Sequence, residues 1–170
     1  MASIGGIPTT AVSSWTTKEI KGISAQDVKK LTTQQVEDLS AEQLKAFSAK
    51  QLNAMTSSQI KAIEVSDLVT LSGKQIGAFD PNEFTYGMST EQIKALTSAQ
   101  TKGLTTAQLN SMTSDKIAAM DAEDIAAMSA KQIQALTTAQ LNALSEEKIQ
   151  SFTAKQVAAF SVDQIKNLST

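Results

Sequence analysis

The chain of 170 residues contains no cysteine, no histidine and no arginine, because all 15 of its positive charges are lysine. These absences exclude disulfides, thiol nucleophiles, imidazole bases and zinc sites of the Cys/His kind. Ser-His-Asp and Cys-His catalytic arrangements are excluded with them. The usual catalytic inventory is therefore missing.

Positive charge and aromatic residues are also scarce. The net charge is -2, the isoelectric point is near 5.2, and aromatic residues make up 4% of the chain. Because the chain has no arginine and no excess of positive charge, it lacks the basic surface that binds nucleic acid. We therefore expect no nucleic-acid partner. With 41% hydrophobic and 19% charged residues the chain is typical of a folded protein, and its core must be mainly aliphatic.

Long hydrophobic runs are absent as well. No stretch of 18 apolar residues occurs, so we expect no membrane span. The first positive side chain is Lys18, and the residues before it lack the charged and apolar regions of a cleaved secretory signal. We expect a protein that is either cytoplasmic or exported without a cleaved Sec signal.

What the sequence does contain is a repeat of eight residues. From residue 89 onward ten units follow one another, among them SAKQIQAL at 129–136 and TTAQLNAL at 137–144. Nine less regular units occupy residues 8–79, and one unit of nine residues, DPNEFTYGM, lies between the two sets. We therefore predict an N-terminal repeat array at 1–79, an irregular unit at 80–88, and a C-terminal repeat array at 89–170.

Each column of the repeat carries a helix signal. The first position is Ser, Thr or Asp in eighteen of the twenty units, and the fourth is Gln in twelve and Glu or Asp in five. This spacing is a capping box, which begins a helix. The fifth position is apolar in nineteen units, with Thr101 as the exception, and the last position is apolar in all twenty. A new helix is thus predicted in every unit.

One long helix or a coiled coil does not fit this repeat. Eight residues advance a helix by about 80° more than two full turns, so the apolar stripe would wander around the cylinder. Apolar spacings of three and five also argue against strands. We predict an all-α fold, an α-solenoid of about twenty short capped helices. Positions five and eight should form its interior, positions two, three and six should face water, and the small seventh position should allow close packing.

The nine-residue unit still begins as a helix. Asp80 is a good cap, Pro81 stands at the first helical position, and Glu83 completes the capping box. The extra residue falls near Tyr86 and Gly87. We interpret the unit as a corner or boundary between the two arrays, with a ligand-binding loop as the alternative.

Few side chains suggest chemistry. The many Ser and Thr residues are explained as helix caps. Acidic clusters at Asp121, Glu123 and Asp124 and at Glu146 and Glu147 fall at helix starts, where they favour the helix dipole, although calcium is an alternative. We predict no catalytic residue, no cofactor, no metal site and no small-molecule substrate.

The units TTAQLNAL, SAKQIQAL and STEQIKAL resemble the Thr/Gln/Ala-rich short tandem repeats, of the "LTTAQ" type, of large secreted or surface proteins of bacteria. The resemblance covers residues from about Thr16 to Leu168 and implies an extracellular or cell-surface structural or adhesive segment without catalytic residues. A cytoplasmic location stays open. The calcium-binding nonapeptides that accompany such repeats in larger proteins are absent from this chain.

Neither end of the array has an obvious polar cap, and this leads to two functional hypotheses. The first is a non-enzymatic structural protein whose subunits assemble head to tail into an extracellular filament or stalk. The proposed assembly contacts are Ile4, Ile7, Val12, Trp15, Ile165, Leu168, Ser169 and Thr170. The alternative is a monomeric solenoid that binds a protein or a surface, with Trp15, Phe84 and Tyr86 as the candidate anchors.

Overall fold

A computed structural model describes residues 3–4, 7–8 and 10–168. The described part holds nineteen α-helices of four to seven residues, as predicted for a solenoid of short helices. The helices are α1 (Thr17–Gly22), α2 (Ala25–Val28), α3 (Thr33–Glu37), α4 (Ala41–Lys45), α5 (Ala49–Asn53), α6 (Ser57–Lys61), α7 (Val65–Leu68), α8 (Gly73–Ile76), α9 (Pro81–Gly87), α10 (Thr90–Lys94), α11 (Ser98–Gly103), α12 (Thr106–Ser111), α13 (Ser114–Ala119), α14 (Ala122–Ala127), α15 (Ala130–Ala135), α16 (Thr138–Asn142), α17 (Glu146–Gln150), α18 (Ala154–Val157) and α19 (Val162–Lys166).

The N-terminal segment differs from the predicted helical units. Strands β1 (Ser3–Ile4) and β2 (Ile7–Pro8) pair antiparallel, with Ile4 opposite Ile7. The unit at 8–15 forms only a 3-10 turn, η1 (Val12–Ser14), and its cap residue Ala11 makes no side-chain capping bond. The reason is in the sequence, because Pro8 and Ala11 replace the Ser/Thr and Gln that begin the other helices.

The capping prediction is confirmed in most helices by reciprocal hydrogen bonds. It is wrong for Glu83, which accepts from Ser57 N–H and does not complete a box with Asp80. In α16 the backbone N–H of Gln140 donates to Thr137 Oγ1 at 3.2 Å, and Thr137 N–H donates to Gln140 Oε1 at 2.8 Å. The same capping box begins thirteen of the described helices. Two to four residues separate neighbouring helices, and at the shortest connections both are extended, as at Leu136 (φ -69°, ψ 139°) and Thr137 (φ -74°, ψ 159°). The chain therefore turns sharply after every unit.

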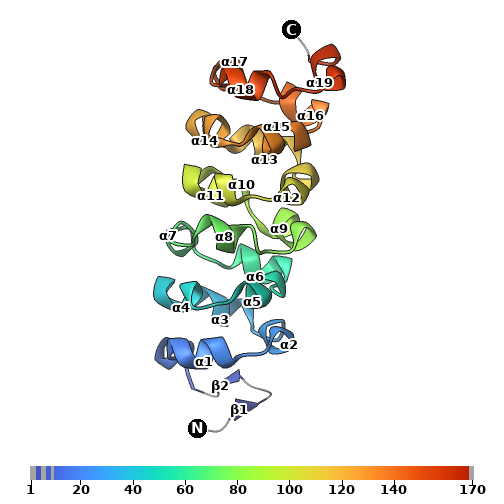
Figure 1. The fold of residues 1–170 in the computed structure, drawn as a ribbon. Helices are drawn as coiled ribbons and strands as arrows, with labels where there is room; N and C mark the ends of the chain where they lie inside the picture. Colours follow the sequence, from blue (N-terminus) through green and yellow to red (C-terminus); the bar gives the residue numbers. More distant parts are fainter. Residues whose placement is uncertain (1–2, 5–6, 9, 169–170) are drawn as a thin grey trace.

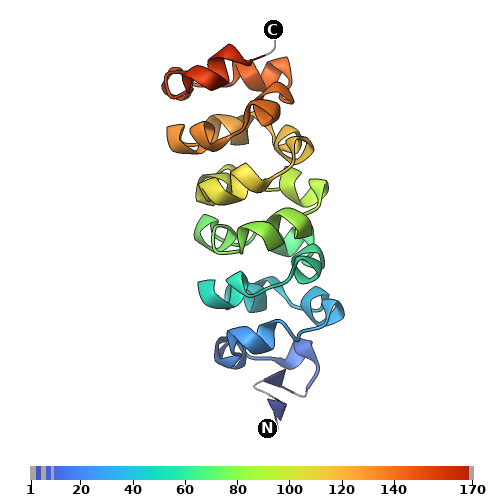
Figure 2. The ribbon, with the colours of Figure 1, turned by 90° about the vertical axis from the view of Figure 1, so that its right-hand side faces the viewer.

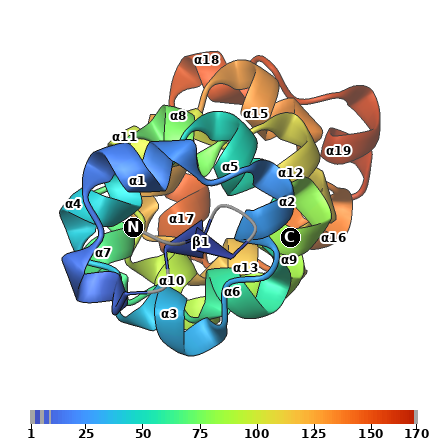
Figure 3. The same cartoon turned by 90° about the horizontal axis from the view of Figure 1, so that it is seen from below.

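These turns wind the helices into a superhelical rod (Figures 1 and 2). Each helix packs on the third helix before it, as α9 does on α6 and α11 does on α8. Viewed from the N-terminal end, the chain runs clockwise from α1 through α2 and α3 to α4 as it recedes, so the superhelix is right-handed (Figure 3). We call one turn of this superhelix a coil. Successive coils are stacked along the axis of the rod.

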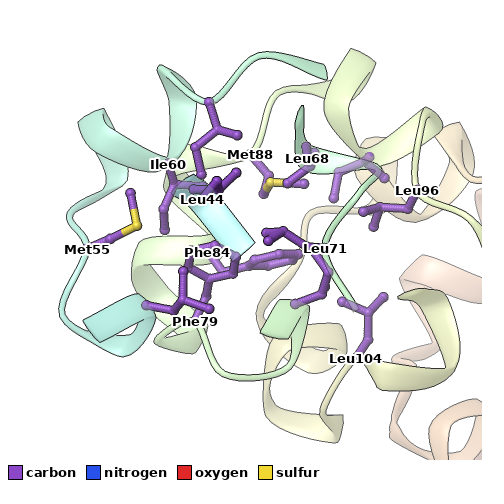
Figure 4. Packing of buried hydrophobic residues seen from close by; sticks show 14 of the residues in the cluster. Leu44, Met55, Ile60, Leu68, Leu71, Phe79, Phe84, Met88, Leu96 and Leu104 are labelled. Atoms are coloured by element: carbon purple, nitrogen blue, oxygen red, sulfur yellow. The ribbon is translucent and has the colours of Figure 1, made fainter. Parts of the chain in front are cut away.

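The fifth and eighth positions form one continuous hydrophobic core, as predicted. It runs from Val12 to Leu144 and is mainly aliphatic. Phe79 and Phe84 meet near the middle with ring centroids 6.2 Å apart, next to Leu71 and Met88 (Figure 4). The third position is exposed in every unit from α1 to α19.

The prediction for the second position is wrong in most units, where that residue is half-buried instead of facing water. The cause is the close packing of the seventh residue against the second residue of the third unit before it. A Cβ added to Gly103 would lie 2.0 Å from the Gly73 carbonyl oxygen. A seventh residue this small allows the two backbones to touch.

The nine-residue unit does not interrupt the stack. Helix α9 packs on α6 before it and is in turn packed on by α12. Its additional residue lengthens the helix, and a Cβ added to Gly87 would lie 2.8 Å from the Cβ of Ile60. The division into arrays at 1–79 and 89–170 stays a prediction.

Candidate functional site

A ladder of glutamine side chains joins each coil to the coil before it. The Nε2 of Gln43 donates to the carbonyl oxygens of Val12 at 2.8 Å and Trp15 at 2.9 Å. These acceptors are the fifth and eighth residues of the fourth unit before Gln43. The same double bond is made by ten glutamines: Gln43, Gln51, Gln59, Gln92, Gln100, Gln108, Gln132, Gln140, Gln156 and Gln164.

Each of these amides is fully used. Its Oε1 accepts the N–H of the helix cap, and both Nε2 hydrogens reach carbonyls of the earlier coil, as the bonds of Gln140 show. All ten side chains are buried. A buried polar group costs little only when its bonds are satisfied, so the ladder fixes both the angle and the register between coils. Because a helix packs on the third unit before it and its Gln reaches the fourth, one superhelical turn contains between three and four units.

Two units have lysine in place of glutamine at the fourth position, and these lysines also donate hydrogen bonds to backbone carbonyls of the earlier coil. Lys116 Nζ donates to the carbonyl of Thr85, and Lys148 Nζ donates to the carbonyl of Ala118. Both acceptors lie in the fourth unit before the lysine, one residue after the carbonyl of the fifth position. Burial lowers the pKa of Lys116.

Acids at the fourth position cannot donate when ionised. Asp124 is buried and instead accepts a hydrogen bond from Ser98 Oγ at 2.7 Å. Burial raises the pKa of the Asp124 carboxyl above its ordinary value, the Ser98 bond opposes this shift, and the charges of Asp121 and Glu123 add to it. Burial and the nearby Glu64 also raise the pKa of Asp67.

Our sequence interpretation missed the ladder, because it treated Gln, Glu and Asp at the fourth position as equivalent capping residues. A capping box needs only an acceptor there. The excess of neutral Gln over Glu was the available signal for a second partner that needs a donor.

The ladder has a direction, and this makes the two ends of the rod different. The interior residues of a unit are covered by later units, so only the last units lack a cover. Exposure at the fifth position rises from 0% at Leu141 to 37% at Ile149, 50% at Val157 and 58% at Ile165. Val162, at the second position of the last unit, is 65% exposed. The C-terminal end therefore presents an open apolar surface, which we call the C-terminal face and define by Ile149, Val157, Val162 and Ile165.

Carbonyl oxygens accompany this apolar surface. Among residues 10–168, no side-chain amide donates to the carbonyl of a fifth or eighth residue in the four units that contain α16, α17, α18 and α19. The last glutamine of the ladder, Gln164, donates to the carbonyls of Ile133 and Leu136. Half-buried Phe152 and Phe160 pack edge to face beside them, with ring centroids 5.3 Å apart. The C-terminal face thus repeats the surface that every earlier coil presents to the next.

Among its described residues, the N-terminal end offers no matching surface. The proposed assembly contacts Val12 and Trp15 are each only 4% exposed, because later units cover them and Gln43 donates to their carbonyls. In Figure 3 the hairpin of β1 and β2 lies across this end of the rod, and half-buried Ile7 packs against the core.

The remaining proposed assembly contacts are divided between the ends. Ile4 belongs to β1, and Leu168 is half-buried against the core. Ile165 is part of the C-terminal face, whereas Ser169 and Thr170 lie outside the described residues. The assembly role of these residues stays a prediction.

Of the three candidate surface anchors, only Tyr86 lies on the surface. It is 80% exposed, while Phe84 and Trp15 belong to the core. Phe84 lies at the fifth position of its unit, where side chains point inward.

The acidic clusters do not form one site. Asp121, Glu123 and Glu147 line a cleft of about 520 Å³ between α14 and α17, which Lys148 also lines. Asp124 is buried and bonds to Ser98. Within the described ranges, no group of three acidic side chains is placed to hold a metal ion. A second cleft of about 470 Å³ beside α2, α5 and α9 is polar, with Lys29, Lys50 and Glu83 in its lining.

No helix among the described residues is long and apolar enough to cross a membrane. A comparison with curated proteins gives no match. The ALTTAQ repeat family matches two segments, at residues 28–62 and 117–154. These matches confirm the resemblance drawn from the units themselves, and they show that the two segments are similar to ALTTAQ repeats.

Proposed function

We propose that the protein is a non-enzymatic structural solenoid whose C-terminal face is a joining surface. One observation carries this proposal. The fifth position is buried in every coil that has a later neighbour, and it is 50–58% exposed in α18 and α19. An apolar surface of this kind, rimmed by polar residues, is typical of an interaction site.

The chemical inventory supports a structural role over an enzymatic one. The sequence has no His or Cys, and Ser and Thr at the first position accept hydrogen bonds from the backbone as helix caps. The resemblance to repeats of secreted and surface proteins supports an extracellular or cell-surface setting.

Head-to-tail self-assembly into a filament is the second hypothesis, and it uses the same C-terminal face. In a filament the N-terminal end of a second copy would cover that face. The burial of Val12 and Trp15 and the hairpin beside them favour a different partner, because this end presents no row of fourth-position amides.

Light scattering at increasing concentration distinguishes the two hypotheses when it is combined with binding of the apolar dye 8-anilinonaphthalene-1-sulfonate. We expect a monomer that binds the dye. Val157→Asp should reduce dye binding, and Ala158→Asp should not, because Ala158 is the exposed residue at the outward sixth position, directly after α18. A concentration-dependent polymer that Val157→Asp abolishes would establish self-assembly instead. A monomer whose dye binding is the same in both variants would refute the C-terminal face as a joining surface.

A further inference from the structure

We infer that the rod contains a joint, at the interface between the coil that contains α4, α5 and α6 and the coil that contains α7, α8 and α9. At this joint the rod bends about the contact of α9 with α6, and the interface opens on the side where α7 packs on α4. The joint lies inside the stack, so it is independent of the C-terminal face and of the function proposed for that face.

The glutamine ladder is interrupted across this interface. We call the pair of bonds that one ladder glutamine makes a rung. Three successive units have Asp67, Gln75 and Glu83 at the fourth position, and among the described residues none of these three forms a rung. Gln75 is half-buried and donates only to the carbonyl of Lys45, at 3.0 Å. Because one superhelical turn contains between three and four units, the gap removes the ladder from most of one cross-section of the rod.

Complete rungs flank the gap on both sides. Three successive units before it and three successive units after it have a ladder glutamine, namely Gln43, Gln51 and Gln59, and Gln92, Gln100 and Gln108. Within residues 10–168, the other gap between two coils spans only Lys116 and Asp124, and Lys116 still donates to a carbonyl of the earlier coil. The coils on each side of the joint are thus held in register, and the interface between them is not.

Helix α7 is weakly attached at this interface. Its cap residue Glu64 makes no side-chain capping bond, and Asp67 has no donor when it is ionised. The helix is held through its apolar residues, because Leu68 is fully buried in the core to which Leu44 of α4 also belongs (Figure 4). Apolar contacts are non-directional, whereas hydrogen bonds fix distance and angle. The core therefore permits a small rotation that a rung would prevent.

The side of the interface formed by α6 and α9 is firmly attached. Glu83 Oε2 accepts the N–H of Ser57 at 2.6 Å, and Gly87 packs closely on Ile60. Helix α6 is also bonded to a later coil, because the Ile60 carbonyl accepts from Gln92 at 3.2 Å. Figures 1 and 3 show α6 and α9 on the other side of the rod from α4 and α7. An interface that is fixed along one side and held mainly by apolar contacts along the other has the geometry of a hinge.

The chain has no cysteine, so spin labels can be attached to introduced cysteines in the full-length protein. Glu42→Cys with Glu91→Cys places two labels on the column α4–α7–α10, across the opening side of the joint. Glu91→Cys with Ala139→Cys spans the same number of units on α10–α13–α16, outside the joint, and Ser58→Cys with Ala107→Cys spans the hinge column α6–α9–α12. All five residues are exposed third positions. We expect double electron–electron resonance to give a broad distance distribution for the first pair and narrow distributions for the other two.

Two substitutions of Asp67 test the cause. Asp67→Gln supplies an amide of the length found in every rung, directed at the carbonyls of Val36 and Leu39, whereas Asp67→Asn removes the same charge with a side chain one methylene shorter. We expect Asp67→Gln to narrow the Glu42–Glu91 distribution and to slow hydrogen exchange in α7 about tenfold. Asp67→Asn should leave both close to those of the unmodified protein, and exchange in α12 should not change in either variant.

Hydrogen exchange of the unmodified chain gives a test without labels, with α14 as the matched control. Helix α14 also begins without a side-chain capping bond, at Asp121, and has Asp124 at the fourth position. Its neighbouring units contain the donors Lys116 and Gln132, so its gap is shorter. We expect exchange in α7 to be about tenfold faster than in α14.

A broad distribution across α4–α7–α10 alone, narrowed by Asp67→Gln and not by Asp67→Asn, supports the joint. Equally narrow distributions in the three columns overturn it, and equally broad ones also overturn it, because the rod would then bend everywhere. Equal effects of the two Asp67 variants would assign the motion to the buried charge instead of the missing rung, which contradicts the inference. Equal exchange in α7 and α14 would contradict it as well. None of these outcomes affects the dye and light-scattering result, which decides the proposed function separately.

Discussion

The side-chain nitrogen of Gln140 lies 2.6 Å from the carbonyl oxygen of Met112, 28 residues earlier in the chain. Gln140 is 2% exposed, and its Oε1 also accepts the cap N–H of Thr137. One side chain thus begins a helix and attaches it to the coil below. This double role explains why a short and otherwise marginal helix is stable in this position.

Replacing this amide by a carboxylate separates the two roles. Gln140→Glu keeps the acceptor for the cap but loses both donations and buries a charge, so we expect a loss of about 2–4 kcal/mol in the free energy of unfolding. Urea denaturation followed by circular dichroism measures it. Gln134→Glu makes the same chemical change at an exposed position and should change the midpoint little. Similar losses for the two variants would contradict the ladder.

The contact of Gly103 with Gly73 predicts a second effect. Gly103→Ala would place a methyl group against the Gly73 backbone, so the α8–α11 contact must open, and we expect a loss of about 1–3 kcal/mol. Gly22→Ala is the control, because no atom lies within 4 Å of the position its Cβ would take. That variant should be neutral or more stable by about 0.4–1 kcal/mol. Thermal melts in which both alanines are tolerated equally would refute the close approach.

Thr101 is the one fifth-position residue that is not apolar. It is fully buried, and its hydroxyl has no hydrogen-bond partner. Thr101→Val replaces that hydroxyl by a methyl group of similar size, and we expect a gain of about 1–2 kcal/mol. Thr90→Val, at an exposed second position, should give no comparable gain. A destabilised Thr101→Val protein in calorimetry would mean that the hydroxyl has a role in folding.

Asp124 predicts a dependence on pH. Burial raises the pKa of the Asp124 carboxyl in the folded state. The contribution of this carboxyl to the free energy of unfolding is therefore complete below the unfolded pKa of about 3.9, and it is lost as the pH rises through the folded pKa. Asp124→Gln does not titrate and supplies the missing donor toward Ile93 and Leu96. We expect it to raise the melting temperature at pH 7, by a smaller margin at pH 4.

The control for this change is Asp115→Gln, which replaces an exposed aspartate at a third position. Its melting temperature should differ little from that of the unmodified protein at either pH. An Asp124→Gln gain that grew as the pH fell would have the wrong sign for a carboxyl whose pKa is raised by burial.

The eight-residue pattern by itself determined where helices begin, which two positions form the hydrophobic core and that the chain is a solenoid. These features are local: the hydroxyl of Thr137 accepts from a backbone N–H three residues away, and Leu144, which is buried like Leu141, follows only two residues after the same short helix ends. A pattern that repeats every eight residues reports such relationships directly.

Only the tertiary structure decided which units touch. The third position was correctly predicted to face water. The second position is half-buried in most units, because the seventh residue of a unit three repeats later packs on it, as Gly103 does on Gly73. The partners of Gln140 lie four units away, and nothing in one octapeptide specifies that distance. The stacking direction also buries Val12 while Ile165 stays exposed, although both occupy the fifth position. The physical reason is that the interior of each coil is covered by the coil after it, so identical units acquire different environments from their place in the stack.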